Sequence, residues 1–463
     1  MSDKKLSHES KKCWEVYNSQ EQRTAIEENA REYIEFLSSC KTERQVVEYA
    51  KEKLVAAGFS SDLNADTCYR IQRGKTVFAA RKGKRPLSEG FRLVGAHADC
   101  PRLDFKQNPL YEDTDLGLAK THYYGGIRKY QWLARPLAIH GVVVKKDGEV
   151  VSISIGDKPE DPVFTVTDLL PHLAYEEVEK KVKDAFDAEK LNVLLGHQPS
   201  EGDEDKDESK KKADKAVHDN MLTLLNDSYG IEEADLYSAE LEVVPAGPAR
   251  FVGLDKSMIG GYGQDDRACC FAALKAFLLE PEPEYTQIVL LWDKEEIGSD
   301  GSTGAQSKFF EYTLDELVDT WEKGTRLSTV LMNGTALSAD VNAGFDPDFK
   351  NVHEPKNSAY MGKGPCFNKF TGHRGKVGAN DAHPEFVAFL RRILDDAGVP
   401  WQMAELGKVD LGGGGTVAKF LARYGMDIID VGPSVLSMHS PFEVTSTVDM
   451  YATVECFRVF LKN

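Results

Sequence analysis

The chain contains 463 residues, 41% of them hydrophobic, so it is long enough for two or three domains with substantial cores. Its formal net charge of -18 at pH 7 argues against nucleic acid and anionic membranes as partners. No stretch approaches the roughly 20 apolar residues that a membrane-spanning helix requires.

The first hundred residues predict helices followed by short strands. Residues 1–5 are polar and lack the apolar centre of a signal peptide. Residues 21–57 have the pattern of two helices, and Thr42 and Gln45 have the form of a capping box at the start of the second. The strand-like segments that follow cover residues 76–80 and 92–96.

The next part of the chain has the composition of a β-rich insert. Residues 136–145 and 149–155 are rich in β-branched side chains and flank Asp147-Gly148, which is a good hairpin signal. Residues 199–215 are almost wholly polar and are predicted to form a solvated, mobile loop. We therefore expect a separate β-rich domain over residues 105–249.

Beyond this insert, helix-like segments alternate with buried strand-like segments. Such alternation predicts an α/β sheet layered with helices, in which ligands gather at the ends of strands. The helix-like segments cover residues 268–279, 384–397 and 448–461, and the strand-like segments cover residues 287–292, 328–332 and 427–431.

The most informative stretch follows one of these strands. Asp293-Lys294-Glu295-Glu296 places two consecutive glutamates at the end of a buried apolar segment. Neighbouring residues there project to different sides, so one carboxylate can bind a metal while the other acts as a general base. A solvated acidic turn explains the pair by itself equally well.

Other candidate ligands also lie near the ends of apolar segments. His97 precedes Asp99 by two residues, which suits an imidazole ligand oriented by a carboxylate. Asp265 has two oxygens and can bridge two cations, although a carboxylate near a helix start is also an ordinary cap. Asp340 and His439 complete the set, and neither would be convincing alone.

Together, these positions form a coherent metal-binding set. Two imidazoles and three carboxylates match the ligands that zinc and similar divalent ions accept, with positions left for water or substrate. His97 precedes the insert and the other candidates follow it, so the catalytic domain is predicted to be split into residues 1–104 and 250–463.

Five motifs run in a fixed order through most of the chain. They are His-x-Asp-x-Pro at residues 97–101, the segment around Asp265, Glu-Glu-x-Gly-Ser at 295–299, Ser-Ala-Asp at 338–340 and Met-His-Ser at 438–440. In this set the chain resembles the M18 aminopeptidases, which include aspartyl aminopeptidase. The resemblance implies a zinc exopeptidase-like fold, with a central mixed sheet between helices, and a two-metal enzyme that removes one residue from the amino terminus of a peptide.

The resemblance also implies a role for each candidate. Asp99 would orient His97, and Glu295 would take a proton from the attacking water and deliver it to the leaving amine. Two cations can polarise the scissile carbonyl and lower the pKa of a water from about 16 towards about 7. Zinc suits the mixed ligands, and cobalt or manganese could also bind. The implied ligands are His97 and Asp340 for one ion, Glu296 and His439 for the other, and Asp265 as the bridge.

For the insert, the resemblance implies dimerisation and a dodecameric shell built from dimers. Residues 170–174 resemble a segment that, in relatives, projects a histidine into the active site of the neighbouring subunit. His172 would then donate a hydrogen bond to the substrate carbonyl or the tetrahedral oxyanion. The alternative is a surface histidine after a proline turn.

The resemblance to aspartyl aminopeptidase leads us to expect a preference for acidic (Asp or Glu) amino-terminal residues, which requires a cation near the substrate side chain. Residues 369–376 are basic, and alignment places Arg374 or Lys376 near the family's specificity lysine. Extra glycines depart from the pattern of the aspartyl enzymes, so an ordinary solvated basic loop is equally consistent. Gly413 and Gly414 could let backbone N–H groups approach the substrate, or they could form a flexible turn.

Three other functions stay open at this point. One is an aminopeptidase for neutral or varied amino-terminal residues, and another is a di-metal deacylase or carboxypeptidase. The third is a noncatalytic shell or peptide-binding protein that retains the fold. The eight cysteines are scattered without a Cys-x-x-Cys pair, which favours reduced thiols and a cytoplasmic location.

Overall fold

A computed structural model of the chain describes residues 6–200 and 215–463. The polar amino terminus and most of the predicted polar loop at residues 199–215 lie outside the described residues. Within the described part, no helix combines the length and the apolar character that crossing a lipid bilayer requires. The chain divides into a first unit, Met1–Cys100 with Ala249–Met438 and Phe442–Asn463, and a second unit, Pro101–Pro248 with His439–Pro441.

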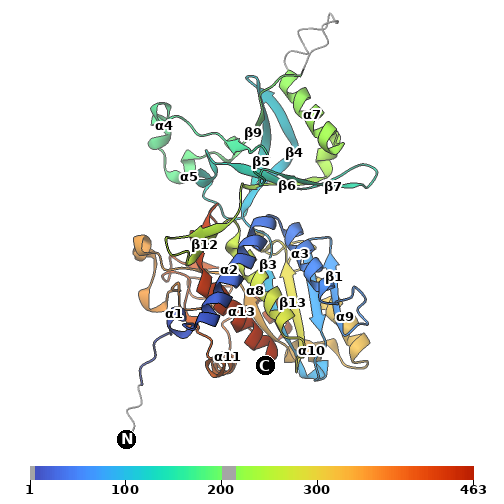
Figure 1. Cartoon of the computed structure of the whole chain (residues 1–463), viewed down its shortest axis with the longest axis vertical. Coiled ribbons are helices and arrows are strands. Elements are labelled where there is room, and N and C mark those ends of the chain that lie inside the picture. The colour runs from blue at the N-terminus through green and yellow to red at the C-terminus, as the bar shows by residue number, and fades with distance from the viewer. Residues whose placement is uncertain (1–5, 201–214) are drawn as a thin grey trace, which may run out of the picture. The chain divides into compact units, whose positions relative to one another are not determined.

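A mixed sheet forms the centre of the first unit, and in the described residues it has eight strands (Figure 1). Their order is β1 (Thr67–Gln72), β2 (Thr76–Arg81), β13 (Thr286–Trp292), β3 (Phe91–His97), β14 (Thr335–Ala339), β20 (Asp427–Gly432), β16 (Cys366–Asn368) and β18 (Gln402–Met403). The inner strands β13, β3, β14 and β20 are parallel, whereas β2 and β16 run antiparallel to their neighbours β13 and β20. The predicted α/β architecture with a mixed sheet is confirmed.

Helices cover both faces of this sheet, which explains why its inner strands are apolar on both sides. Val94 and Ala96 of β3 pack in the core that holds α2, α3, α8, α11 and α13, whereas Phe91 and Leu93 pack with α9, α10 and α12. Figure 1 shows α2, α8 and α13 side by side on one face. The bounds are α2 Gln20–Ser39, α3 Glu43–Ala56, α8 Gln264–Leu279, α9 Phe309–Trp321, α10 Leu327–Asn333, α11 Pro384–Ala397, α12 Ala418–Leu421 and α13 Thr447–Lys462.

The local predictions for the first unit are confirmed at its start and wrong at one strand. The Thr42 hydroxyl accepts the N–H of Gln45 at 3.3 Å, and the Gln45 side chain accepts the N–H of Thr42 at 3.0 Å, as the capping box requires. Residues 328–332, predicted as a strand, belong to α10 instead. A short apolar run does not distinguish a strand from a buried helix, and α10 buries Val330 and Leu331 against the sheet.

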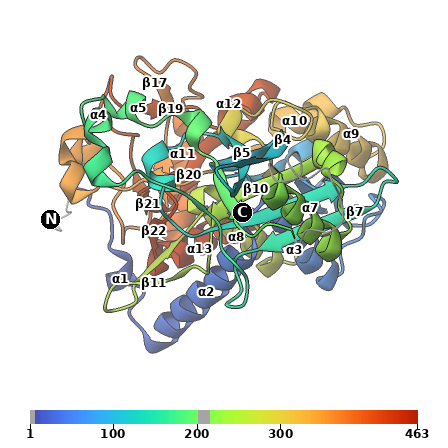
Figure 2. The same ribbon diagram turned by 90° about the horizontal axis from the view of Figure 1, so that it is seen from above.

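Smaller elements complete the first unit. A five-stranded sheet in the described residues consists of β11 (Arg250–Val252), β12 (Met258–Gly261), β22 (Glu443–Ser446), β21 (Ser434–Leu436) and β15 (Asn342–Ala343). A two-stranded ribbon pairs β17 (Gly372–His373) with β19 (Gly413–Gly414), and the two lie side by side in Figure 2. The short helix α1 spans Cys13–Val16.

The second unit is built around an antiparallel sheet that has seven strands in the described residues. The order is β7 (Val150–Ile155), β6 (Leu137–Val144), β10 (Ala239–Pro245), β4 (Arg102–Asp113), β5 (Leu116–Tyr124), β9 (Val193–Gly196) and β8 (Thr165–Val166). The predicted hairpin is confirmed, because β6 and β7 pair across a turn in which Gly148 has a φ of 91°. Helix α7 (Ala216–Tyr229) packs on this sheet, and α4 (Tyr175–Val178) and α5 (Val182–Ala185) are single turns.

Candidate active site

Three parallel strands of the first unit end at one edge of the central sheet and deliver predicted ligands there. In the pairing of β13 with β3, Trp292 lies opposite His97, so residues 293–296 leave the sheet beside the imidazole. The register of β14 against β3 brings Asp340, the first residue after β14, level with His97. Ligands commonly bind outside the carboxyl ends of parallel strands, so the fold places these side chains where a site is expected.

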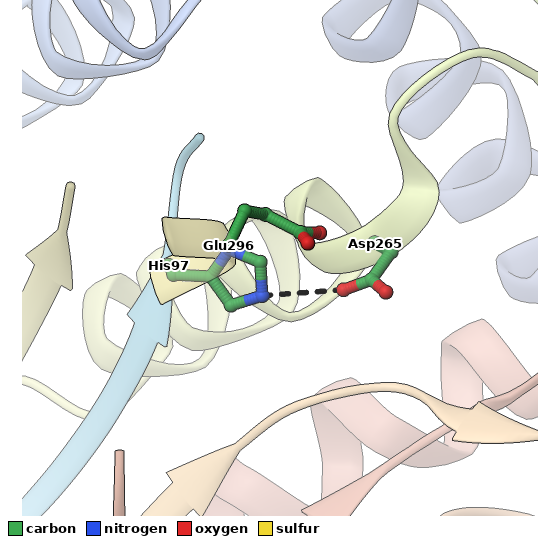
Figure 3. Close-up of side chains that lie close together, drawn as sticks. All are labelled: His97, Asp265 and Glu296. Atoms are coloured by element: carbon green, nitrogen blue, oxygen red, sulfur yellow. Dashed lines mark ion pairs between the residues drawn. The ribbon is translucent and has the colours of Figure 1, made fainter. Parts of the chain in front are cut away.

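His97 is buried and faces several carboxylates. Its Nε2 lies 3.2 Å from Asp265 Oδ1 and 4.0 Å from oxygens of both Glu295 and Asp340. Ligand atoms of His97, Asp265 and Glu296 all lie within 4.8 Å of one another, and Figure 3 shows the three side chains converging. The structure thus brings together five of the site residues predicted from the sequence, which are His97, Asp265, Glu295, Glu296 and Asp340.

A second group of atoms could also hold a cation. It consists of one ligand atom each from His97, Asp266 and Asp340, again within 4.8 Å of one another. The main-chain N–H of His97 donates to Asp266 Oδ2 over 3.4 Å. From the sequence, a metal-binding role is predicted for Asp265 alone, because two adjacent aspartates cannot be told apart by sequence.

The shifted pKa values of Asp340 and His97 indicate a site that suits a cation. Burial, and then the charge of Asp265, raises the pKa of Asp340 well above its usual value. For His97, burial disfavours the imidazolium, but hydrogen bonds with Asp265 and Asp99 outweigh this and raise its pKa. A divalent cation would offset both the desolvation and the mutual repulsion of these carboxylates. Imidazole and carboxylate donors are also the ligands that zinc accepts, so the set fits such an ion.

Asp99 connects the ends of the two strands that carry the imidazole and the glutamate pair. It is fully buried, and its Oδ1 and Oδ2 accept the main-chain N–H groups of Glu295 and Glu296, each at 3.1 Å. His97 Nδ1 lies 3.4 Å from Asp99 Oδ1 and 3.0 Å from the Asp99 carbonyl oxygen. The carboxylate therefore fixes the turn of the glutamate pair in addition to contacting the imidazole.

Three buried side chains that sequence reasoning missed hold the backbone of the candidate ligands. Glu443 Oε2 accepts the N–H of Asp265 at 3.2 Å. The thiol of Cys100 donates to the carbonyl of Asp265 at 2.8 Å, and the thiol of Cys270 donates to the carbonyl of His97 at 3.0 Å. Only Cys100, which adjoins the His-x-Asp motif, lies close enough in sequence to have been suspected.

Two predicted site residues belong to the second unit. His439 Nδ1 lies 2.9 Å from the carbonyl oxygen of Gly126. His172 is exposed in the short 3₁₀ helix Pro171–Leu173. Their roles as metal ligand and oxyanion donor stay predictions. The exposed apolar side chains on the segment around His172 are Leu169, Leu170, Leu173, Tyr175, Val178 and Val182.

The two predicted substrate-binding segments meet in the ribbon of β17 and β19. Gly413 pairs with His373, has a φ of 130°, and a Cβ there would lie 2.3 Å from the carbonyl oxygen of Gly372, so only glycine fits. Arg374 and Lys376 lie in the exposed turn beyond β17, and both have positive φ. Gly414 lies in β19 next to Gly413, and the substrate roles of these residues stay predictions.

Comparisons with known proteins identify the family. The protein-family model described as aminopeptidase I zinc metalloprotease (M18) matches residues 36–461 of this chain. The chain is 47% identical to the "Probable M18 family aminopeptidase 1" of Clostridium acetobutylicum, with 99% of each chain covered. It is similar to the crystal structure of the M18 aminopeptidase from Thermotoga maritima, with a TM-score of 0.92, 46% identity, and 98% of this chain and 100% of that one covered. The S. cerevisiae mApe1 dodecamer shares the fold, with a TM-score of 0.76, 23% identity, and 95% and 97% covered. The chain therefore belongs to the M18 family of zinc aminopeptidases.

Proposed function

We propose that this aminopeptidase works with two divalent ions, zinc in the first instance and cobalt or manganese as alternatives. The observation that carries the proposal is the convergence of a buried imidazole and several carboxylates at the carboxyl ends of β3, β13 and β14. The proposed ligands are His97 and Asp340 for one ion, Glu296 and His439 for the other, and Asp265 as the bridge between them.

The neighbouring side chains supply the proton transfers and the positioning. When bound, the ions provide the Lewis acidity that polarises the scissile carbonyl and activates a water. Glu295 lies beside the ligand Glu296 with a side chain only 14% exposed, and it takes the proton of the attacking water and delivers it to the leaving amine. Asp99 keeps Glu295 in place through the main chain. His172 of a neighbouring copy would stabilise the oxyanion.

Replacing Glu295 by glutamine tests the proposal. The variant should retain zinc, because Glu295 is not a ligand, and should lose turnover by at least about 100-fold, because it lacks the general base. Zinc content and kcat would be measured on the same preparation, with the exposed Glu282→Gln as the matched control. Unchanged turnover would remove Glu295 as the base. Equal cleavage of free and acetylated peptides would favour the deacylase alternative.

The preference for the amino-terminal residue has two versions. A preference for Asp or Glu depends on the basic segment at residues 369–376. However, Lys369 and Lys376 both form ion pairs with Asp381, at 2.6 and 3.0 Å, which favours an enzyme for neutral or varied residues. Values of kcat/KM for Asp-, Glu-, Leu- and Lys-terminal substrates separate the versions, and a clear excess for the acidic pair would restore the first.

We also propose a homododecamer built from dimers. The segment around His172 exposes six large apolar side chains within the 14 residues 169–182, and such exposure is usually covered in an assembly. The S. cerevisiae relative described as a dodecamer shares the fold. Light scattering of the purified protein would give its mass directly, and a monomer would contradict the proposal. The eight cysteines are free and buried, which supports a cytoplasmic location.

A further inference from the structure

Two loops of the first unit are tied to each other and to the central sheet. β17 and β19 pair, and the hydroxyls of Thr371 and Thr416, which flank this ribbon, lie 3.3 Å apart. Both hydroxyls, and that of Ser338, lie near the buried carboxylate of Asp430 and lower its pKa against the effect of burial. The residues that flank the ribbon therefore lie against Asp430 of β20.

The sheet register relates Asp430, and with it the ribbon, to one of the candidate metal ligands. In the pairing of β14 with β20, Asp430 lies directly opposite Ser338. Asp340 is two residues beyond Ser338, so it continues the same side of the sheet about 7 Å farther along. From this register we infer that the loops carrying the basic segment lie on the side of the site where the side chain of an amino-terminal residue would bind.

The lysines of this segment share one counter-ion. Lys369 Nζ lies 2.6 Å from Asp381 Oδ1, and Lys376 Nζ lies 3.0 Å from Asp381 Oδ2. Hydrogen bonds from both lysines lower the pKa of Asp381, so it is ionised at neutral pH and cancels one of their two charges. Lys376 also lies 3.9 Å from the centre of the Phe370 ring, which holds its chain in place.

These ion pairs are accessible to a solute. The side chains of Lys369, Lys376 and Asp381 are 38%, 45% and 42% exposed, so their charges act on any group that approaches the ribbon from solvent. Without Asp381 the ribbon would present two uncompensated lysines beside the site. With Asp381, an acidic side chain gains less attraction and also meets a carboxylate.

We propose that Asp381 determines the selectivity of the enzyme for the amino-terminal side chain, by offsetting one of the two lysine charges that would otherwise attract Asp or Glu. Uncharged amino-terminal residues are then the preferred class of substrate. This inference rests on the proposed function and deepens it, because it assigns selectivity to a residue outside the metal-binding set.

Asp381→Asn tests the assignment, because it retains the size of the side chain and removes its charge. The measurement is the ratio of kcat/KM for a Glu-terminal substrate to kcat/KM for a Leu-terminal substrate. A unit charge about 4 Å from another in water corresponds to about a fivefold change, so we expect the ratio to rise about fivefold, mainly through KM. The rise should shrink as salt is added. Asp396→Asn, on the exposed surface of α11, is the matched control and should leave the ratio unchanged.

A second variant guards against a misfolded first one. Lys376→Gln removes one of the two attracting charges, so it should change the ratio in the opposite direction to Asp381→Asn. An unchanged ratio in both variants, at low and at high salt, would overturn the inference and leave the aminopeptidase mechanism intact. If zinc-loaded wild-type protein cleaves neither substrate, the proposed function itself fails, and the two failures are distinguishable.

Discussion

Removing the Asp99 carboxylate should disconnect the two strand ends that form the site. Its oxygens accept the N–H groups of Glu295 and Glu296, each at 3.1 Å, and one of them lies 3.4 Å from His97 Nδ1. Asp99→Ala removes these contacts at a fully buried position, where water cannot easily replace them. Asp99→Asn retains one acceptor oxygen and is the graded companion.

The expected loss is large because the acceptor is charged. A hydrogen bond to a charged group stabilises the folded state by about 1.5–3 kcal/mol. The two main-chain bonds to Asp99 together therefore stabilise the folded turn at Glu295 and Glu296 by about 3–6 kcal/mol. Replacing the outer partner of a metal-binding histidine typically changes metal affinity or activity about 10–100-fold. For Asp99→Ala we therefore expect kcat/KM to fall about 100-fold and zinc affinity about tenfold, with Asp99→Asn in between.

The assay combines zinc affinity, measured by competition with a chromophoric chelator, with kcat and KM on the same preparation. Asp319→Asn, on the exposed side of α9, is the matched control and should behave as wild type. Wild-type zinc affinity and turnover in Asp99→Ala would refute the reasoning. Equal losses in the alanine and asparagine variants would show that the number of acceptor oxygens is not what matters.

Two further predictions concern buried groups near the site. Burial raises the pKa of Asp430 from its ordinary value of about 4 to about 6. Protonated Asp430 therefore contributes its full stabilisation of the folded state below about pH 4, and this contribution is lost by about pH 6. The free energy of unfolding should fall by about 3 kcal/mol across this range, and Asp430→Asn should abolish this pH dependence in unfolding curves. Cys100→Val leaves the Asp265 carbonyl without its thiol donor, which costs about 1–3 kcal/mol. Cys100→Ser keeps a donor and should retain more zinc affinity; equal affinities in the two variants would contradict this role.

The convergence of His97 and Glu296 could be anticipated from the sequence, because a simple rule of parallel sheets governs it. His97 and Glu296 lie at or just beyond the ends of strands that were predicted, and the ends of parallel strands meet at one edge. Asp340 follows β14 (Thr335–Ala339) and not the strand expected at residues 328–332, so only its residue type and motif pointed to it. The chemistry of the residues then indicated a metal site. For His97 and Glu296, neither step required knowledge of the loops between the strands.

The residues that hold this site could not be found in the same way. Glu443 and Cys270 act on the main chain of Asp265 and His97, and the partners in each pair are far apart in sequence. A buried glutamate in a strand and a thiol in an apolar helix carry no local pattern that names their partners. The wrong strand at residues 328–332 has a related cause, since tertiary packing, and not the apolar run itself, decided in favour of α10.

The effective charge of the basic segment could not be predicted from the sequence either, and it bears on which substrates the enzyme attracts. Counted along the sequence, residues 369–376 are a basic patch, but in the fold Asp381 neutralises part of it. The whole chain carries a net charge of -18, so its long-range field also repels anions and attracts cations. The negative field of the whole protein attracts a peptide that has a protonated amino terminus and an uncharged first side chain. An acidic first side chain cancels that attraction. In the proposed selectivity, the Asp381 carboxylate and the overall field therefore act in the same direction, against acidic amino termini.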